Sequence, residues 1–183
     1  PHAAAWIKTL ENCPSISCIQ LCGDWPKDLV GDKKIVELDD VSKGLVPDFA
    51  LVCATNDEAP SLAEISIDAG IPTIVEKPVA RNSAEIDKLN DSAKISGSIW
   101  ATGFLNRYHP SVIQLKKWIK SGAIGRVLSI EGRMVTSDVQ ARNPSHWLFD
   151  EERAGGGILH WLGIHTIDLI RYLTNLEFSK VCG

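Results

Sequence analysis

The sequence predicts an α/β protein whose first part is a doubly wound parallel sheet. Two observations lead to this prediction. Short apolar segments of strand composition alternate with segments whose apolar residues recur at helical spacing. The segments at 49–54 (FALVCA) and 73–75 (TIV) are almost wholly apolar, as strands are when helices cover both faces of their sheet. Parallel strands need right-handed helical crossovers, so both observations describe one architecture.

The first predicted elements are a helix and a strand. Residues 2–11 place Ala, Ile and Leu at helical spacing, which predicts a helix. Residues 16–22 form a short β-branched run that ends at a Gly-Asp pair, a strand followed by a turn. After the strand at 49–54, a helix over about 58–69 is expected to end at Gly70 in the left-handed conformation.

The next elements are marked by their caps. Asn82, with Glu85 three residues later, predicts a capping box for the helix that follows the third strand. Residues 98–104 have strand composition. Pro110 suits the first turn of a further helix, which is expected to end just before Gly122.

The chain changes character near Phe104. Residues 126–136 alternate polar and apolar side chains, which predicts a longer strand in a sheet with unequal faces. A polar loop then leads to three glycines at 155–157 and a helix through Leu173. We therefore expect a parallel-sheet domain at 1–104 and the start of an α/β open-sheet domain at 105–183.

Composition excludes several classes of partner. Net charge is −4, and no basic run indicates a nucleic-acid surface. No apolar run approaches the ~20 residues of a membrane span. The five cysteines are odd in number and lack paired metal spacing, which favours buried reduced thiols and no metal site. We expect a cytoplasmic protein with neither a nucleic-acid nor a membrane partner.

Polar residues follow two of the apolar strands, at the end of a parallel sheet where ligands bind. Thr55 and Asn56 follow the strand at 49–54, and they either cap the next helix or face a ligand. Glu76, Lys77 and Pro78 follow the strand at 73–75. Burial there would lower the pKa of Lys77 and suit it to polarise an alcohol or carbonyl, and Pro78 would set its direction. The alternative is a surface ion pair of Glu76 and Lys77.

The helix after the three glycines carries a third set of polar residues. Trp161, His165, Asp168 and Tyr172 share one face at helical spacing, so Asp168 can reach His165. His160 lies five residues before His165, which is not the spacing of a paired-histidine zinc site. A core histidine is the alternative, although the glycines indicate a close backbone approach.

In order and spacing, these motifs resemble the Gfo/Idh/MocA family, named for glucose–fructose oxidoreductase and inositol dehydrogenase. Glu76-Lys77-Pro78 looks like the family's signature tripeptide, and residues 103–110 (GFLNRYHP) are similar to its domain-crossing segment. Residues 121–127 (SGAIGRV) match its turn into the second domain, and residues 155–168 resemble its glycine-rich helix start with the active-site histidine.

The resemblance implies an N-terminal Rossmann domain that binds NAD or NADP and a sugar- or polyol-like substrate held between two domains. His165 would be the general base for the substrate hydroxyl, and Lys77 would orient that oxygen. Full-length relatives often form homo-oligomers. The residues implied on the cofactor side are Thr55, Asn56, Glu76, Lys77 and Arg107; those implied on the substrate side are Lys77, Trp161, His165 and Asp168.

The chain departs from the family pattern at three places. Trp161 stands where many members have an acid, four residues before His165. Gly23 stands where the ribose-binding acid is expected, with Asp24 one residue late, which leaves NAD against NADP open. No G-x-G-x-x-G occurs, so we expect a fragment of a longer protein, inactive by itself and with an exposed apolar face.

Two alternatives to an oxidoreductase remain at this point. One is a non-catalytic protein that senses NAD(P) or a sugar on the same scaffold. The other is a hydrolase or lyase that uses the redox cofactor only transiently.

Overall fold

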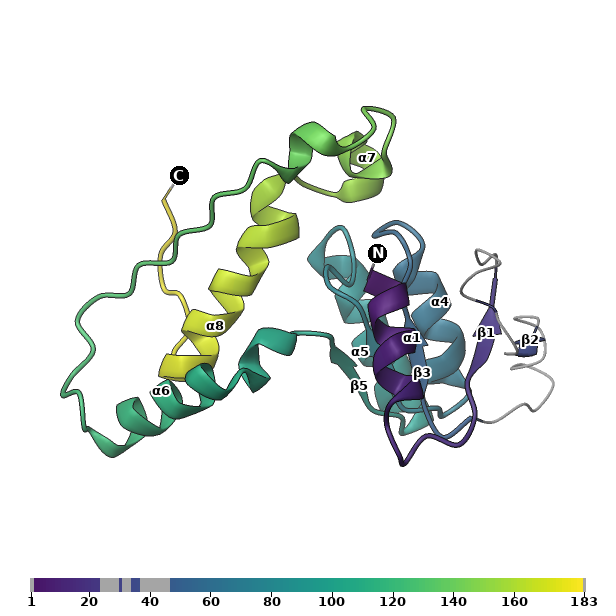
Figure 1. The fold of residues 1–183 in the computed structure, drawn as a ribbon, viewed down its shortest axis with the longest axis horizontal. Helices are drawn as coiled ribbons and strands as arrows, with labels where there is room; N and C mark the ends of the chain where they lie inside the picture. The colour runs from purple at the N-terminus through teal and green to yellow at the C-terminus, as the bar shows by residue number, and fades with distance from the viewer. Residues whose placement is uncertain (1, 24–29, 31–33, 37–46, 183) are drawn as a thin grey trace.

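The computed structural model describes residues 2–23, 30, 34–36 and 47–182 (Figure 1). The N-terminal part holds the strands with the helices α1 (His2–Glu11), α4 (Ala59–Asp68) and α5 (Ser83–Ser96). The C-terminal part holds α6 (Pro110–Ser121), α7 (Glu151–Ala154) and α8 (Ile164–Thr174). A 3₁₀ turn, η1 (Leu105–Tyr108), follows the last strand and joins the two parts. The helix α8 begins near α7 and runs away from the sheet, so that its later turns lie beside α6.

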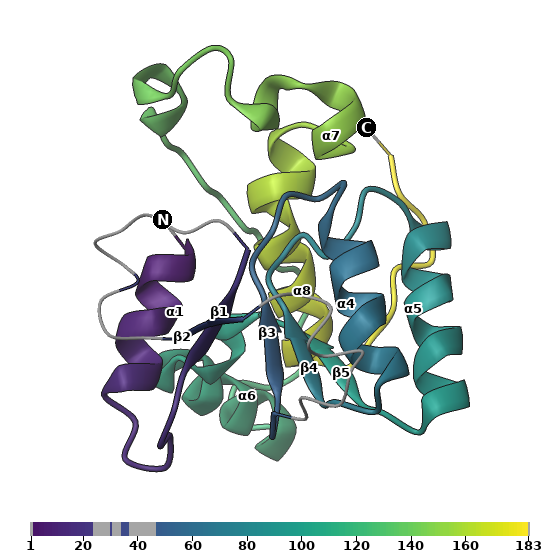
Figure 2. The ribbon, with the colours of Figure 1, turned by 90° about the vertical axis from the view of Figure 1, so that its right-hand side faces the viewer.

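The described strands are all parallel. β1 (Gln20–Cys22) pairs with β2 (Lys34–Val36), and a second sheet has the order β3-β4-β5. Its strands are β3 (Ala50–Val52), β4 (Thr73–Val75) and β5 (Trp100–Thr102). Figure 2 shows the strands between α1 on one side and α4 and α5 on the other. This arrangement confirms the predicted parallel α/β fold. β4 has the predicted bounds, whereas β1, β3 and β5 are shorter than the runs that predicted them.

The helices begin and end close to their predicted bounds. They are α1 (His2–Glu11), α4 (Ala59–Asp68), α5 (Ser83–Ser96), α6 (Pro110–Ser121) and α8 (Ile164–Thr174). The Asn82 side chain accepts a hydrogen bond of 3.1 Å from the Glu85 amide, as the capping box requires. The Glu85 carboxylate bonds back to the amide of Arg81 rather than to that of Asn82. Gly70 is left-handed, with φ +75°.

The core lies between the three-stranded sheet and the helices α4 and α5. Val52 and Val75 from the strands pack against Ala63 and Ile67 of α4 and Leu89 of α5, and all five side chains are buried. This packing fixes the strand ends relative to the helices. It therefore also fixes the positions of the polar residues that follow β3 and β4.

The predicted strand at 126–136 is wrong. Residues 127–137 have no regular secondary structure and run as an extended segment beside α8. A strand needs a neighbouring strand to hydrogen-bond with its backbone. None of the described residues after Thr102 belongs to a strand, so this segment has no such neighbour there. The segment lies so near α8 that a side chain at Gly132 would meet Cγ2 of Thr166 at 2.0 Å.

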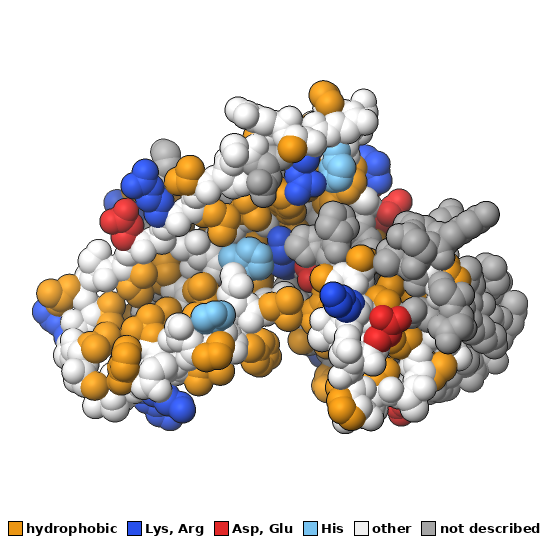
Figure 3. Space-filling model, in the orientation of Figure 1, with side chains coloured by type: hydrophobic (Ala, Val, Ile, Leu, Met, Phe, Trp, Pro, Cys, Tyr) orange, Lys and Arg blue, Asp and Glu red, His pale blue; other side chains and the backbone are white. Residues whose placement is uncertain are grey.

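Large apolar side chains are exposed in the C-terminal part, as expected. Figure 3 shows them over α6 and the neighbouring extended segment. Leu128 and Val135, from the extended segment, are 79% and 80% exposed, and Trp118 of α6 is 48% exposed. A contiguous apolar surface of this kind normally faces another surface.

Candidate functional site

Glu76 and Lys77 follow β4 directly and are buried, with 8% and 7% of their surfaces exposed. The Glu76 carboxylate accepts a hydrogen bond of 2.9 Å from the Trp6 indole and another of 2.9 Å from the Lys77 amide. Such burial is incompatible with a solvent-exposed ion pair, so the alternative interpretation of this tripeptide is wrong. Its polar groups are held inside the protein at the carboxyl end of the sheet.

The Lys77 ammonium reaches the segment that precedes α8. Its Nζ donates a hydrogen bond of 3.2 Å to the backbone carbonyl of Trp161 and lies 5.5 Å from the centroid of the Trp161 ring. Burial lowers the pKa of Lys77, and the nearby Glu76 carboxylate opposes that shift only in part. A lysine that releases its proton more readily than usual is suited to interact with an alcohol or carbonyl oxygen.

Trp161 lies in a π-helical turn, Leu159–Gly163, that runs directly into α8. Turns of this type are rare and occur often at functional sites. The first turn of α8 carries His165, whose ring packs edge-on against Phe104 with centroids 6.3 Å apart. Lys77 and Phe104 follow neighbouring strands, so the sheet end and the start of α8 form one site.

The buried Asp168 and the partly exposed Arg107 form an ion pair that the sequence did not predict. Arg107 Nε donates to both carboxylate oxygens of Asp168, at 3.0 and 2.9 Å, and Nη2 also donates to the carboxylate. The guanidinium lies 5.4 Å from the ring centroids of Phe104 and Tyr172. The hydrogen bonds to Asp168 raise the pKa of Arg107. The ion pair therefore links η1, which contains Arg107, to α8, which contains Asp168.

Thr55 and Asn56 do not cap α4. The N-cap of that helix is Glu58, without a side-chain cap bond, and the Thr55 hydroxyl donates to the Glu58 carboxylate at 2.8 Å. Asn56, which is 2% exposed, donates from its amide to the carbonyl of Ala154 at 2.7 Å. The capping interpretation is therefore wrong, and Asn56 binds the polypeptide of the C-terminal part.

A short helix, α7 (Glu151–Ala154), is hydrogen-bonded to the loop after β3. Arg153 donates to Asp57 at 3.0 Å and to the Thr55 hydroxyl at 3.4 Å. Burial raises the pKa of Asp57, but its polar neighbours Thr55 and Arg153 outweigh that effect and the net shift is downward. The sequence did not single out Arg153 or Asp57, because ionic side chains in polar loops carry no periodic signal.

Gly155 explains why glycines follow α7. Its φ is +71°, and a Cβ there would lie 2.5 Å from Cα of Arg81. Arg81 also donates to the Glu152 carbonyl at 3.2 Å. The glycine-rich sequence thus permits α7 to lie directly on the loop that leaves Glu76-Lys77-Pro78, as the predicted close approach requires.

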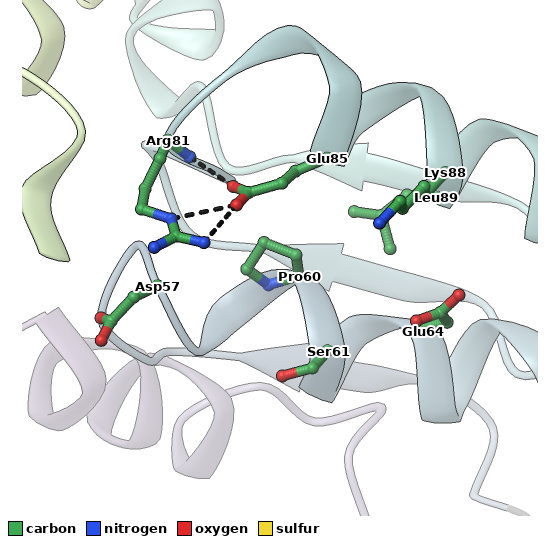
Figure 4. A pocket seen from close by; sticks show the side chains of 8 residues that line it. All are labelled: Asp57, Pro60, Ser61, Glu64, Arg81, Glu85, Lys88 and Leu89. Atoms are coloured by element: carbon green, nitrogen blue, oxygen red, sulfur yellow. Dashed lines mark hydrogen bonds and ion pairs between the residues drawn. The ribbon is translucent and has the colours of Figure 1, made fainter. Parts of the chain in front are cut away.

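Two hollows flank these contacts. One, of about 190 Å³, lies between α4 and α5, where the Arg81 guanidinium points between Asp57 and Glu85 (Figure 4). The other, of about 410 Å³, lies beside Pro78, Phe104 and His160. Neither is lined by Lys77 or His165. The buried polar groups therefore identify the site better than these volumes do.

Two absences concern only the part of the chain that the structure describes. Within it, no group of three or more His, Cys, Asp or Glu side chains could hold a metal ion. Among the same residues, no helix combines the length and the apolar composition that crossing a membrane requires.

Family models of two consecutive regions match the chain. The model described as "Oxidoreductase family, NAD-binding Rossmann fold" of GFO_IDH_MocA matches residues 25–104. The model of the GFO/IDH/MocA C-terminal domain matches residues 112–183. Together they cover most of the chain, in the order that the motifs predicted.

Individual dehydrogenases are also similar to this chain in sequence. Levoglucosan dehydrogenase of Pseudarthrobacter phenanthrenivorans is 38% identical over 123 residues, which are 65% of this chain and 31% of that protein. Myo-inositol 2-dehydrogenase of Thermotoga maritima is 28% identical over 134 residues, 73% of this chain and 38% of that protein. The chain thus spans less than half the length of these relatives.

Solved structures share the fold. A levoglucosan dehydrogenase in complex with NADH and levoglucosan superposes with a TM-score of 0.76 at 24% identity, covering 93% of this chain and 49% of that one. A myo-inositol 2-dehydrogenase from Lactobacillus plantarum superposes with a TM-score of 0.71 at 20% identity, covering 95% and 53%. At these identities the likeness shows the fold alone.

Proposed function

This chain belongs to the Gfo/Idh/MocA family, and from this membership we propose that the whole protein is an NAD(P)-dependent dehydrogenase or reductase. It transfers a hydride between NAD or NADP and a hydroxyl or carbonyl group of a sugar- or polyol-like substrate. The observation that carries the proposal is the buried Lys77, whose ammonium lies at the start of the helix that bears His165.

In this proposal Lys77 and His165 are the catalytic residues. Lys77 donates a hydrogen bond to the substrate oxygen and orients it. In the oxidative direction, His165 takes the proton from the hydroxyl oxygen while a hydride leaves the carbon that bears this hydroxyl. The alcohol thereby becomes a carbonyl. When bound, the nicotinamide cofactor supplies the two-electron acceptor. Trp161 and Asp168 lie on the substrate side, Trp161 as a wall and Asp168 as the anchor of Arg107.

The residues at the strand ends fit a cofactor. Thr55 follows β3 and Glu76 follows β4, and these neighbouring parallel strands end at the edge of the sheet where dinucleotides bind. Gly103 passes so near that a Cβ there would lie 3.4 Å from Oε1 of Glu76. Asn56 is hydrogen-bonded to Ala154 and Arg107 to Asp168. We therefore propose that these two residues hold the segments around the cofactor in place and do not contact the cofactor themselves.

The domain boundary, the assembly and the location belong to the same proposal. A boundary near Phe104 is supported by the two family models, because one ends at residue 104 and the other begins at residue 112. Homo-oligomerisation is supported by the exposed apolar residues of the C-terminal part, and the cytoplasm by the reduced cysteines. The named relatives act on levoglucosan and inositol, which supports a sugar- or polyol-like substrate.

The test uses the full-length protein with NAD or NADP, levoglucosan and a panel of inositols, read at the nicotinamide absorbance. Lys77→Met and His165→Asn are each expected to lower turnover by about 10²-fold or more, the scale of a lost acid–base group. Wild-type turnover in both variants would contradict these roles. Binding of NAD(P) without turnover would favour a sensor, and product formation without net nicotinamide reduction would favour a lyase or hydrolase.

A further inference from the structure

Two cationic side chains contact the indole of Trp161. Arg142, from the extended loop before α7, places Cζ 4.5 Å from the Trp161 ring centroid. Lys77 places Nζ 5.5 Å from the same centroid and bonds to the Trp161 carbonyl. A cation held over an aromatic ring keeps its charge while its direction is fixed. Trp161 therefore holds two positive charges near His165, which lies one helical turn later.

The Arg142 guanidinium retains an unused donor. Its Nε is buried and has no hydrogen-bond partner among the residues that the structure describes. Buried donors are nearly always paired in folded proteins, and guanidinium groups pair best with planar anions. An Arg whose buried Nε has no protein partner near a substrate site therefore indicates a ligand that supplies an acceptor.

The acids nearby do not neutralise these cations. The Asp168 carboxylate is bonded to Arg107 through both oxygens. The Glu76 carboxylate accepts hydrogen bonds from the Trp6 indole and the Lys77 amide. The substrate side thus holds more positive than negative charge.

We infer that the substrate of the proposed reaction is a sugar acid, an anionic sugar or polyol bearing a carboxylate. Arg142 binds that carboxylate with its guanidinium, and Trp161 holds the guanidinium in place. Lys77 uses one of its three N–H donors on the Trp161 carbonyl and orients the hydroxyl that is oxidised with another. This inference rests on the proposed function only for the reaction, because binding of the carboxylate can be measured without turnover.

A cofactor phosphate is the other anion that Arg142 could meet. The residues that fit the cofactor, Thr55 and Glu76, follow β3 and β4, whereas Arg142 lies against Trp161 beside His165. The substrate carboxylate is therefore the favoured source. The two sources differ in which ligand loses affinity when Arg142 is replaced.

The experiment measures binding to the full-length protein by calorimetry with NAD present. The probes are three matched pairs of an acid and its neutral counterpart: glucuronate and glucose, galacturonate and galactose, gluconate and sorbitol. We expect at least one acid to bind about tenfold or more tightly than its partner, the effect of one charge-assisted contact. That preference should weaken as ionic strength rises, because the contact is ionic.

The variants assign the preference to Arg142. Arg142→Met keeps the length of the side chain and removes its charge, and it should abolish the preference, whereas Arg142→Lys should retain part of it. Arg133→Met, at an exposed arginine of the neighbouring segment, is the matched control and should keep the whole preference. Melting curves establish that each variant is folded.

Several results would overturn the inference. They are equal binding of acid and neutral partner in all three pairs, absence of binding by any acid, a preference that survives Arg142→Met, and an Arg142→Met variant that loses NAD(P) affinity instead. Turnover is scored separately. Arg142-dependent binding of an acid without nicotinamide reduction would refute the proposed reaction and support the anionic ligand.

Discussion

Arg107 and Asp168 tie the segment after the parallel sheet to the helix that carries His165. Both carboxylate oxygens of Asp168 accept from Arg107 Nε, and the guanidinium lies against Phe104 and Tyr172. Asp168 is almost completely buried, while the Arg107 side chain is 37% exposed. The position of His165 relative to Lys77 therefore depends on an ion pair between residues distant in the sequence.

Replacement of Arg107 should destabilise the protein more than replacement of both partners. Arg107→Met leaves the buried Asp168 carboxylate unpaired, at a cost near the lower end of about 3–5 kcal/mol because Arg107 is partly exposed. Arg107→Met with Asp168→Leu should recover much of that loss. Urea unfolding of full-length Arg107→Met, Asp168→Leu and the double variant measures this, and additive losses in the double variant would refute the coupling.

Gly155 and Gly157 offer a matched pair of substitutions. Gly155→Ala forces a Cβ into a left-handed residue and to within 2.5 Å of Cα of Arg81, so we expect a loss of about 2 kcal/mol or more. At Gly157 a Cβ would meet nothing within 4 Å, and Gly157→Ala should change stability little. Thermal melts of both variants measure the difference in stability. Equal effects would show that α7 does not need the close approach of Gly155 to Arg81.

The two bonds that hold α7 to the loop after β3 should differ in strength. Asn56→Ala removes a donor that is buried and leaves the Ala154 carbonyl unsatisfied, a loss of about 1–3 kcal/mol. Arg153→Ala removes an ion pair that solvent screens, so its effect on stability should be smaller than that of Asn56→Ala. Hydrogen exchange of the α7 amides provides the measurement. Faster exchange in Arg153→Ala than in Asn56→Ala would reverse this ranking.

Stability should depend on the protonation of Lys77. Burial lowers its pKa in the folded protein, whereas the unfolded chain has the ordinary value of about 10.4. Between the two values the unfolded state binds the additional proton, so this residue makes stability rise with pH across that window. Lys77→Met should remove this contribution and Lys117→Met, at an exposed lysine, should not. Urea midpoints from pH 7 to about 10.5 would test the sign.

Local signals in the sequence were sufficient for most elements. The Asn82 cap, the left-handed Gly70 and the end of α6 before Gly122 were predicted because each depends on residues a few positions apart. The strand expected at 126–136 failed for the opposite reason. Alternation shows which faces a strand would have, but only a neighbouring backbone makes it a strand, and the described residues of the C-terminal part provide none.

The sequence alone determined the parallel α/β fold, the order of the motifs and the placement of Lys77 after a buried strand. It did so because periodicity, caps and strand ends are properties of short segments. Only the tertiary structure decided that Asn56 bonds to Ala154, Arg107 to Asp168 and Lys77 to Trp161. Those partners lie 98, 61 and 84 residues away, and their choice depends on how the elements pack. A polar residue's type shows what it can bind, and packing selects which partner it meets.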